Sequence, residues 1–201
     1  MGVATLARRG PRCTAMNDVE LKFKGRVITV NVEHVMLPNQ RRAQLEIVHH
    51  PGGAAIVALD EQERICLLRQ FRHAGGGFLW ELPAGKLEPA EPPFETARRE
   101  LVEEAGVEAR EWRSLGNLLP SPGVFTEVIH LFMARELCPA ALAHEEHEVI
   151  EVHWIPLAEA WDRAVTGNIP DAKTALGILR TRALLDAGLL PPLLQHTSIL
   201  K

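Results

Sequence analysis

Residues 85–107 read Gly-Lys-Leu-Glu-Pro-Ala-Glu-Pro-Pro-Phe-Glu-Thr-Ala-Arg-Arg-Glu-Leu-Val-Glu-Glu-Ala-Gly-Val. The second half of this segment, at about 93–105, predicts an α-helix. Pro92 and Pro93 stand at its start, where a missing N–H costs little, and Gly106 stands just past its end. Three glutamates on this helix are spaced i, i+3 and i+4, so we expect their carboxylates on one face and close together. They are Glu100, Glu103 and Glu104.

The three carboxylates predict a metal site. Like charges at these spacings repel, and the negative end of the helix macrodipole adds to the repulsion, so a divalent cation is the natural partner. Hard carboxylate oxygens favour Mg²⁺ or Mn²⁺ over zinc. For an isolated Glu-x-x-Glu-Glu pattern the alternative is a merely solvated acidic face. Within the longer segment, Arg99 can pair with Glu91 and hold the preceding loop, and Gly85 permits a tight turn where a strand becomes a loop.

The whole segment matches the pattern G-x5-E-x7-R-E-U-x-E-E-x-G-U, with U aliphatic, at every fixed position. It therefore resembles the signature of the Nudix hydrolases, and a chance match of this length is negligible. The matching residues are Gly85, Glu91, Arg99, Glu100, Glu103, Glu104 and Gly106, with Leu101 and Val107 at the aliphatic places.

This resemblance implies a fold of the α/β (α+β) class: the Nudix fold, an α/β/α sandwich with a mixed β-sheet. It implies that Glu100 and Glu104 are the main ligands of Mg²⁺, or of Mn²⁺ in its place. Glu103 is a further implied ligand and a candidate catalytic carboxylate, and the backbone carbonyl of Ala84 is another implied ligand. The structural positions of the motif are Gly85, Glu91, Arg99 and Gly106.

Segments outside the motif resemble the ADP-ribose pyrophosphatase subgroup. They are residues 68–72, 80–85, 120–123 and 171–174, with Pro122 at the place about fifteen residues beyond the motif where that subgroup carries a proline. The resemblance implies Mg²⁺-dependent hydrolysis of ADP-ribose to AMP and ribose 5-phosphate. A GDP-mannose hydrolase, or a hydrolase of another nucleoside diphosphate sugar, is the alternative within this class. A catalytically silent Nudix domain that senses a ligand is the alternative of a different class, and the intact set of acidic residues argues against it.

Four residues are candidates for substrate binding. Arg72, at the end of an expected strand, can hold a phosphate, or can be a surface arginine or part of a structural ion pair. Glu81 can bond a sugar or base, or can brace a loop. Pro122 and Gly123 form at least a turn, and functional loops often contain such turns.

A second acidic cluster, His-Glu-Glu-His-Glu at 144–148, precedes an expected strand at 149–155 and is interpreted as a mobile loop. In the resembled subgroup, a loop at this place supplies a glutamate that acts on the attacking water or on a metal. Alignment on the following strand places Glu148 nearest that catalytic and metal-binding role, and Glu146 next. The alternative is a solvated acidic loop.

The rest of the chain divides into three expected parts. Residues 1–15 are expected to be a disordered extension, with a basic targeting peptide as the alternative. Residues 16–50 are expected to be an N-terminal subdomain of antiparallel strands, and 51–201 the Nudix hydrolase domain. The N-terminal strands, in 19–49, have little of their own to bury, so we expect a homodimer through them. Runs at 53–59 and 64–71 are expected to form a hairpin, further strands are expected near 78–82, 110–118 and 126–134, and two helices near 156–166 and 171–187.

Composition limits the partners. The chain has 201 residues and a formal net charge of −4, which predicts no nucleic-acid surface. No apolar run approaches the ~20 residues of a membrane span. Cys13, Cys66 and Cys138 are odd in number and widely spaced, which fits neither a disulfide framework nor a zinc site. We therefore expect a cytoplasmic enzyme whose partners are a nucleotide substrate and a second copy of itself.

Overall fold

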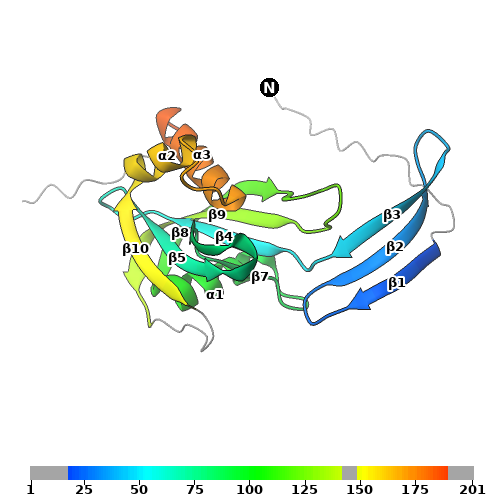
Figure 1. Ribbon diagram of the computed structural model, residues 1–201. Coiled ribbons are helices and arrows are strands. Elements are labelled where there is room, and N and C mark those ends of the chain that lie inside the picture. The colour runs from blue at the N-terminus through cyan, green and yellow to red at the C-terminus, as the bar shows by residue number, and fades with distance from the viewer. Residues whose placement is uncertain (1–17, 142–148, 190–201) are drawn as a thin grey trace, which may run out of the picture. The chain divides into compact units, whose positions relative to one another are not determined.

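The computed structural model describes residues 18–141 and 149–189 of the protein. These residues fall into two compact units, shown by element in Figure 1. The first unit runs to His50 and includes Gly123–Thr126, and the second contains the remaining residues from Pro51 onward. No helix in the described ranges is long and apolar enough to cross a membrane.

The first unit is a three-stranded antiparallel sheet. Its strands are β1 (Asp18–Lys24), β2 (Thr29–Met36) and β3 (Arg42–His49), in the order β1-β2-β3. These are the antiparallel strands that the sequence predicted within 19–49. The segment Gly123–Thr126 joins the free side of β3, where the Val48 N–H donates to the Val124 carbonyl at 2.9 Å and the Thr126 N–H donates to the Val48 carbonyl at 3.0 Å.

Two sheets form the centre of the second unit. One has the order β7-β4-β9-β8 and is mixed, because β4 and β9 are parallel while its other pairs are antiparallel. The other has the order β10-β5-β6 and is antiparallel, with a 3₁₀ turn at His73–Gly75 between β5 and β6. The bounds are β4 Gly53–Ala58, β5 Arg64–Arg72, β6 Gly77–Glu81, β7 Ala84–Lys86, β8 Val107–Leu118, β9 Ile129–Pro139 and β10 Ile150–Pro156.

The predicted hairpin of 53–59 with 64–71 is wrong. Both strands exist, but β4 lies in the mixed sheet and β5 in the antiparallel one, and a single isolated bridge, Leu59 to Ile65, joins their ends. The physical reason is that β4 is buried along its whole length and pairs on both sides, with β7 and β9. β9 takes one edge of β4 along its whole length and β7 takes the other at Gly53–Ala55, while β5 pairs with β6 and β10 in the second sheet.

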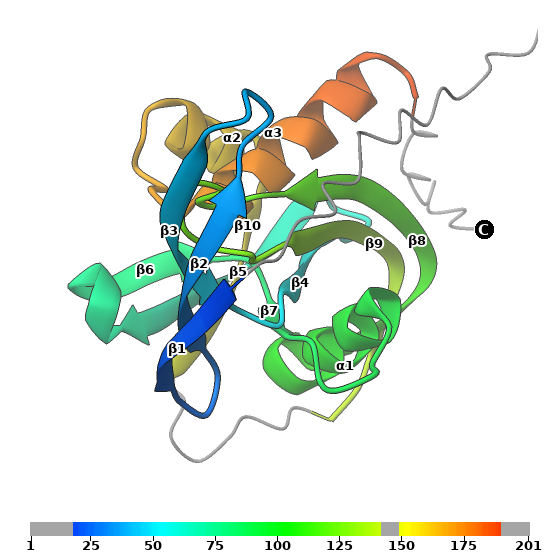
Figure 2. The same ribbon diagram turned by 90° about the vertical axis from the view of Figure 1, so that its right-hand side faces the viewer.

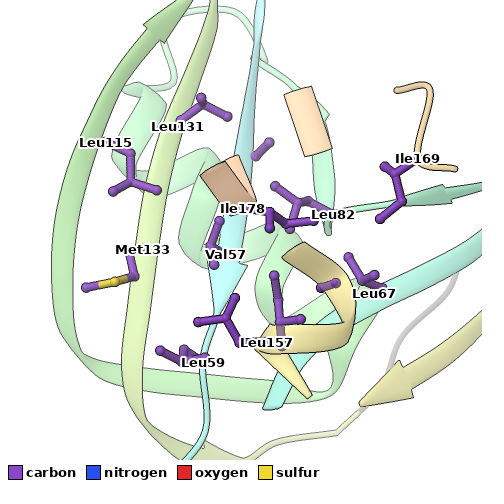
Figure 3. Packing of buried hydrophobic residues seen from close by; sticks show 13 residues of the cluster. Val57, Leu59, Leu67, Leu82, Leu115, Leu131, Met133, Leu157, Ile169 and Ile178 are labelled. Carbon is purple, nitrogen blue, oxygen red and sulfur yellow. The ribbon is translucent and has the colours of Figure 1, made fainter. Parts of the chain in front are cut away.

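Helices cover both sides of the strands, as Figure 2 shows with α1 on one side and α2 and α3 on the other. Alternate residues of β4, continued by Leu59, contribute to two separate cores, because successive strand side chains point to opposite faces. Ala55, Val57 and Leu59 pack with α2 and α3, in the cluster drawn in Figure 3. Ala54, Ile56 and Ala58 pack with Ala97, Leu101 and Ala105 of α1. This arrangement confirms the predicted α/β/α sandwich with a mixed sheet.

Local signals mark the ends of the helices. α1 spans Pro93–Ala105 as predicted, and Gly106 caps it in the left-handed conformation with its N–H bonded to the Val102 carbonyl at 3.1 Å. α2 spans Leu157–Val165, and α3 spans Ala172–Asp186. The Asp171 carboxylate caps α3 by accepting from the Thr174 N–H at 3.0 Å. Both C-terminal helices agree with their predicted ranges to within one residue at each end.

Candidate active site

Helix α1 buries two rows of side chains against the sheets. The apolar row, Ala97, Leu101 and Ala105, fills the core under the helix. The polar row, Thr96, Glu100 and Glu104, is buried as deeply and lies beside it. A buried carboxylate is costly unless it is paired or hydrogen-bonded, so this row must meet polar partners. Thr96 bonds Glu91, Glu100 bonds Arg99, and Glu104 bonds the backbone of β7.

Glu104 bonds the outer edge of β7. Its side chain is 3% exposed, and its Oε2 accepts from the Ala84 N–H at 2.7 Å. Ala84 is paired with Ala55, yet its N–H points away from β4. The N–H and C=O of one strand residue point to the same side, so the Ala84 carbonyl faces the same edge. The Lys86 carbonyl, two residues on, accepts from Arg99 Nη2 at 3.3 Å. Side chains of α1 thus occupy the edge where a further strand would pair.

Glu100 packs on Gly85, and this contact explains the glycine. A Cβ added to Gly85 would lie 1.7 Å from Glu100 Oε1 and 2.0 Å from its Cδ. Gly85 is not among the glycines with positive φ, so the expectation of a conformationally demanding turn there is wrong. The residue is required because a carboxylate from α1 closely approaches the backbone of β7.

Arg99 is the protein's own counter-charge for the acidic cluster. Its guanidinium donates to both oxygens of Glu91 at 3.0 Å, to Glu100 Oε1 at 2.6 Å and to Glu103 Oε2 at 3.0 Å. Hydrogen bonds from Arg99, opposed by partial burial and assisted by Thr96, lower the pKa of Glu91 to about 2. The expected pairing of Arg99 with Glu91 is present, and it holds the loop before α1.

The structure distinguishes Glu103 from the other two glutamates. Its side chain is 39% exposed and lines a cleft of about 430 Å³ that includes Trp112 of β8. At 3.6 residues per turn, Glu103 and Glu104 point about 100° apart, whereas Glu100 and Glu104 are about 40° apart. Accordingly, no group of three or more acidic, histidine or cysteine side chains in the described ranges forms a ready-made metal site. Arg99 Nη1 nevertheless bonds both Glu100 Oε1 and Glu103 Oε2, so Glu103 lies beside Glu100 as expected, and the three carboxylates differ in burial: Glu100 and Glu104 are buried and Glu103 is partly exposed. Their joint role as metal ligands stays a prediction.

A second polar cluster surrounds Glu81, which is 2% exposed. Arg72 binds it with two parallel hydrogen bonds, Nε to Oε1 at 2.8 Å and Nη2 to Oε2 at 3.0 Å. Lys173 Nζ donates to Oε2 at 2.5 Å and lies 3.0 Å from Asp171. Burial by itself raises the pKa of Glu81, but the bonds and charges of Arg72 and Lys173 outweigh it and lower that pKa. This geometry favours the bracing interpretation of Glu81 and the ion-pair interpretation of Arg72.

Comparison with known proteins is consistent with this architecture. A family profile for the NUDIX domain matches residues 49–175. The chain belongs to the Nudix family. Its helix α1, with Glu91, Arg99, Glu100, Glu103 and Glu104, is the Nudix helix and the loop that precedes it.

Individual relatives match most of the chain. A protein named ADP-ribose pyrophosphatase from Bacillus subtilis (strain 168) is 39% identical over 158 residues, 78% of this chain and 85% of that protein. One of the same name from Mycobacterium tuberculosis (strain ATCC 25618 / H37Rv) is 37% identical over 168 residues, 82% of this chain and 81% of that protein. A GDP-mannose pyrophosphatase from Cronobacter sakazakii (strain ATCC BAA-894) is 37% identical over 158 residues, 72% of this chain and 82% of that protein.

A solved structure supports the fold. The crystal structure of an ADP compounds hydrolase superposes with a TM-score of 0.73 at 23% identity, covering 85% of this chain and 93% of that one. The similarity extends well beyond the Nudix helix, and the chain is a Nudix pyrophosphohydrolase of the α/β/α fold.

The donor set of the Nudix helix suits a hard divalent cation. Glu100 and Glu104 present carboxylate oxygens to the edge of β7, toward which the Ala84 carbonyl also points. Mg²⁺ is typically bound through one or two carboxylates together with substrate phosphates and water, and not in an all-protein cage. A pair of buried carboxylates beside a backbone carbonyl therefore fits such an ion, and nothing in the set is a soft sulfur ligand.

Four predicted residues belong to a turn or fall outside the described ranges. Pro122 and Gly123 form the turn that enters the segment paired with β3, which agrees with the minimal expectation of a turn. Their role in substrate binding stays a prediction. Glu146 and Glu148 fall within 142–148, outside the described residues.

Sequence reasoning missed the contribution of α3 to the Glu81 cluster. Residues 171–174 carried a resemblance, but no contact could be assigned to Lys173, which is 92 positions from Glu81. Thr174 is fully buried, and its Oγ1 accepts from the Leu82 N–H at 2.8 Å while donating to Asp171 at 2.5 Å. The sequence did indicate that Asp171 could cap the helix by bonding Thr174, three residues on. That local pattern does not predict that Thr174 also bonds Leu82.

Proposed function

We propose that the protein hydrolyses the pyrophosphate bond of ADP-ribose to AMP and ribose 5-phosphate with Mg²⁺, and that Mn²⁺ can replace Mg²⁺. The observation that carries the proposal is the pair of buried carboxylates, Glu100 and Glu104, held against the outer edge of β7. The substrate is drawn from the two relatives named ADP-ribose pyrophosphatase, which are 37–39% identical over about four fifths of this chain.

Each residue of this edge has a proposed task. Glu100, Glu104 and the Ala84 carbonyl would hold the ion, and Glu103, beside the cleft, would complete its surroundings when substrate is present. A bound divalent ion would supply polarisation of the phosphoryl oxygens and neutralise charge on the leaving phosphate. Arg99 limits repulsion among the carboxylates. Glu148, or else Glu146, is proposed to position or deprotonate the attacking water.

Arg72 is proposed to face the substrate phosphates. Its side chain is 41% exposed although both oxygens of Glu81 hold its guanidinium. A planar guanidinium fixed by a bidentate carboxylate is oriented in advance, and its remaining N–H donors suit a phosphate. In this proposal Glu81 acts through Arg72 and does not itself contact a sugar or base.

GDP-mannose is the second candidate substrate, because a relative of that name is 37% identical over 72% of this chain. The experiment is a comparison of kcat/KM for ADP-ribose and GDP-mannose with Mg²⁺, read by AMP and GMP release. ADP-ribose is expected to be preferred. A tenfold or larger preference for GDP-mannose would replace the substrate assignment. Absence of turnover on both, together with retained binding of either, would favour the ligand-sensing alternative.

We also propose that residues 16–50 form a homodimer. Val19, Leu21 and Phe23 of β1 are 49%, 57% and 54% exposed, which is unusual for three large apolar side chains of one short strand. A second copy of this chain is the proposed cover. Light scattering coupled to gel filtration should give twice the chain mass, and replacing Leu21 and Phe23 by aspartate should give the monomer. A wild-type monomer at micromolar concentration would refute this proposal.

A further inference from the structure

The segment Glu81–Ala84, which leads from β6 into β7, is hydrogen-bonded at every residue by other elements of the second unit. The Glu81 carboxylate is bound by Arg72 of β5 and Lys173 of α3. The Leu82 N–H donates to Thr174 Oγ1 at 2.8 Å. The Pro83 carbonyl accepts from the Ile56 N–H of β4 at 2.9 Å, and the Ala84 N–H donates to Glu104 of α1 at 2.7 Å.

The backbone of helix α3 also packs directly against the Leu82 side chain of this segment, at Gly177. A Cβ added to Gly177 would lie 2.8 Å from Leu82 Cδ1 and 3.0 Å from Val57 Cγ2. Gly177 is one helical turn beyond Thr174, so the two residues present the same face of α3 to Leu82. Helix and segment are therefore in direct contact through a side-chain hydroxyl, a glycine and the nearby ammonium of Lys173.

We propose that Lys173 and Thr174 are positioning residues for the metal edge of the site. They fix Glu81 and Leu82, and through the two following residues they fix Ala84, whose N–H orients the Glu104 carboxylate and whose carbonyl faces the same edge. The proposal rests on the function proposed above, because it assumes that Ala84 and Glu104 receive the ion. Groups that orient metal ligands from outside typically change metal affinity or activity by about 10- to 100-fold when they are removed.

The chain supplies a matched control on the same helix. Thr181, like Thr174, is fully buried, but its Oγ1 has no hydrogen-bond partner among the described residues. Thr174→Val and Thr181→Val are the same nearly isosteric change at two buried places on α3. Only Thr174→Val removes hydrogen bonds among the described residues: the one from the Leu82 N–H and the one that Thr174 Oγ1 donates to Asp171. In Thr174→Val the helix cap keeps the bond from the Thr174 backbone N–H to Asp171.

The experiment measures Mn²⁺ binding to the full-length protein without nucleotide, by the electron paramagnetic resonance signal of free Mn²⁺, alongside melting temperatures. Thr174→Val should weaken Mn²⁺ binding by about tenfold. Thr174→Ser, which keeps the hydroxyl, and Thr181→Val should bind as the wild type does. Unchanged binding in Thr174→Val, or an equal loss in Thr181→Val, would overturn the proposal.

Two further variants complete the test. Lys173→Met keeps roughly the length of the side chain but removes the ammonium that binds Glu81 beside Arg72. It should weaken Mn²⁺ binding, and it keeps the proposal testable if Thr174→Val does not fold. Wild-type Mn²⁺ binding in Lys173→Met would also overturn the proposal. Glu104→Gln separates a failure of the positioning role from a failure of the proposed metal site. If Glu104→Gln binds Mn²⁺ as the wild type does, the proposed metal edge itself is misplaced. If Glu104→Gln loses the ion while Lys173→Met and Thr174→Val keep it, the positioning role alone fails.

Discussion

Replacing Gly85 by alanine should abolish most activity while leaving the fold intact. The added Cβ would lie 1.7 Å from Glu100 Oε1, and real Cβ contacts essentially never fall below 3.0 Å, so the carboxylate must retreat by about 1.3 Å. A displacement of about 1 Å at a catalytic group can cost about a hundredfold in rate. That loss corresponds to about 2.7 kcal/mol of transition-state stabilisation. Because the φ of Gly85 is outside the left-handed range, alanine adds no backbone strain there.

The assay is kcat/KM for ADP-ribose with saturating Mg²⁺, together with Mn²⁺ binding and thermal melting. Gly85→Ala should lose about a hundredfold in kcat/KM and should weaken Mn²⁺ binding, with a melting temperature near that of the wild type. Combining it with Glu100→Asp, which shortens the opposing carboxylate by one methylene, should recover part of the Mn²⁺ affinity lost in Gly85→Ala. The reasoning is refuted if Gly85→Ala keeps wild-type metal binding and turnover. It is also refuted if the loss in Gly85→Ala follows global unfolding and Glu100→Asp restores nothing.

Four further outcomes are expected. Glu104→Gln should lose several kcal/mol of transition-state stabilisation and most of the melting-temperature gain that Mg²⁺ gives the wild type. Near wild-type turnover in Glu104→Gln would mean that the metal does not bind at α1. Glu148→Gln should lower kcat with little change in substrate Kd, whereas a dead Glu146→Gln beside an active Glu148→Gln would shift the water-positioning role by two residues. The pKa of Glu91 is lowered from its usual 4.5 to about 2, so its ion pair stabilises the fold fully above about pH 4.5, and this contribution is lost as pH falls toward 2. Acid melting curves of Glu91→Gln should therefore fall less steeply across that window than those of the wild type, and parallel curves would contradict the assignment. Burial, followed by the charge of Glu104, raises the pKa of Cys66 to about 12, so this thiol should resist a thiol reagent at pH 8 in the native protein and react once denatured.

Helix α1 could be predicted closely because everything that defines it is local. Prolines at its start, a glycine at its end and the i, i+4 spacing of its residues act within a few positions along the chain. The pair Arg99 and Glu91 was predictable for the same reason, since only eight positions separate them. Gly85 illustrates a partial success: the motif identified the residue, but its physical reason, close contact with the Glu100 carboxylate, required the position of α1 over β7.

The motif also concealed a distinction among its own glutamates. Spacing alone suggested three equivalent carboxylates, but Glu103 is partly exposed and lines the cleft beside Trp112, while Glu104 is buried and accepts from the Ala84 N–H. The strand order failed for a related reason. Sequence neighbours such as β4 and β5 favour a hairpin by proximity, yet β4 is taken on both sides by β7 and β9.

The sequence by itself determined the family, the reaction class and the Nudix helix with its ends. These are properties of short-range periodicity and of a motif whose spacing is dictated by one helical element. The tertiary structure alone decided that Lys173 and Thr174 meet Glu81 and Leu82, about 92 positions away along the chain. That contact depends on how closely α3 packs over the sheets, which in turn depends on a glycine where any side chain would collide with Leu82 and Val57. Long-range partners of this kind follow from the packing of whole elements, and no local pattern encodes them.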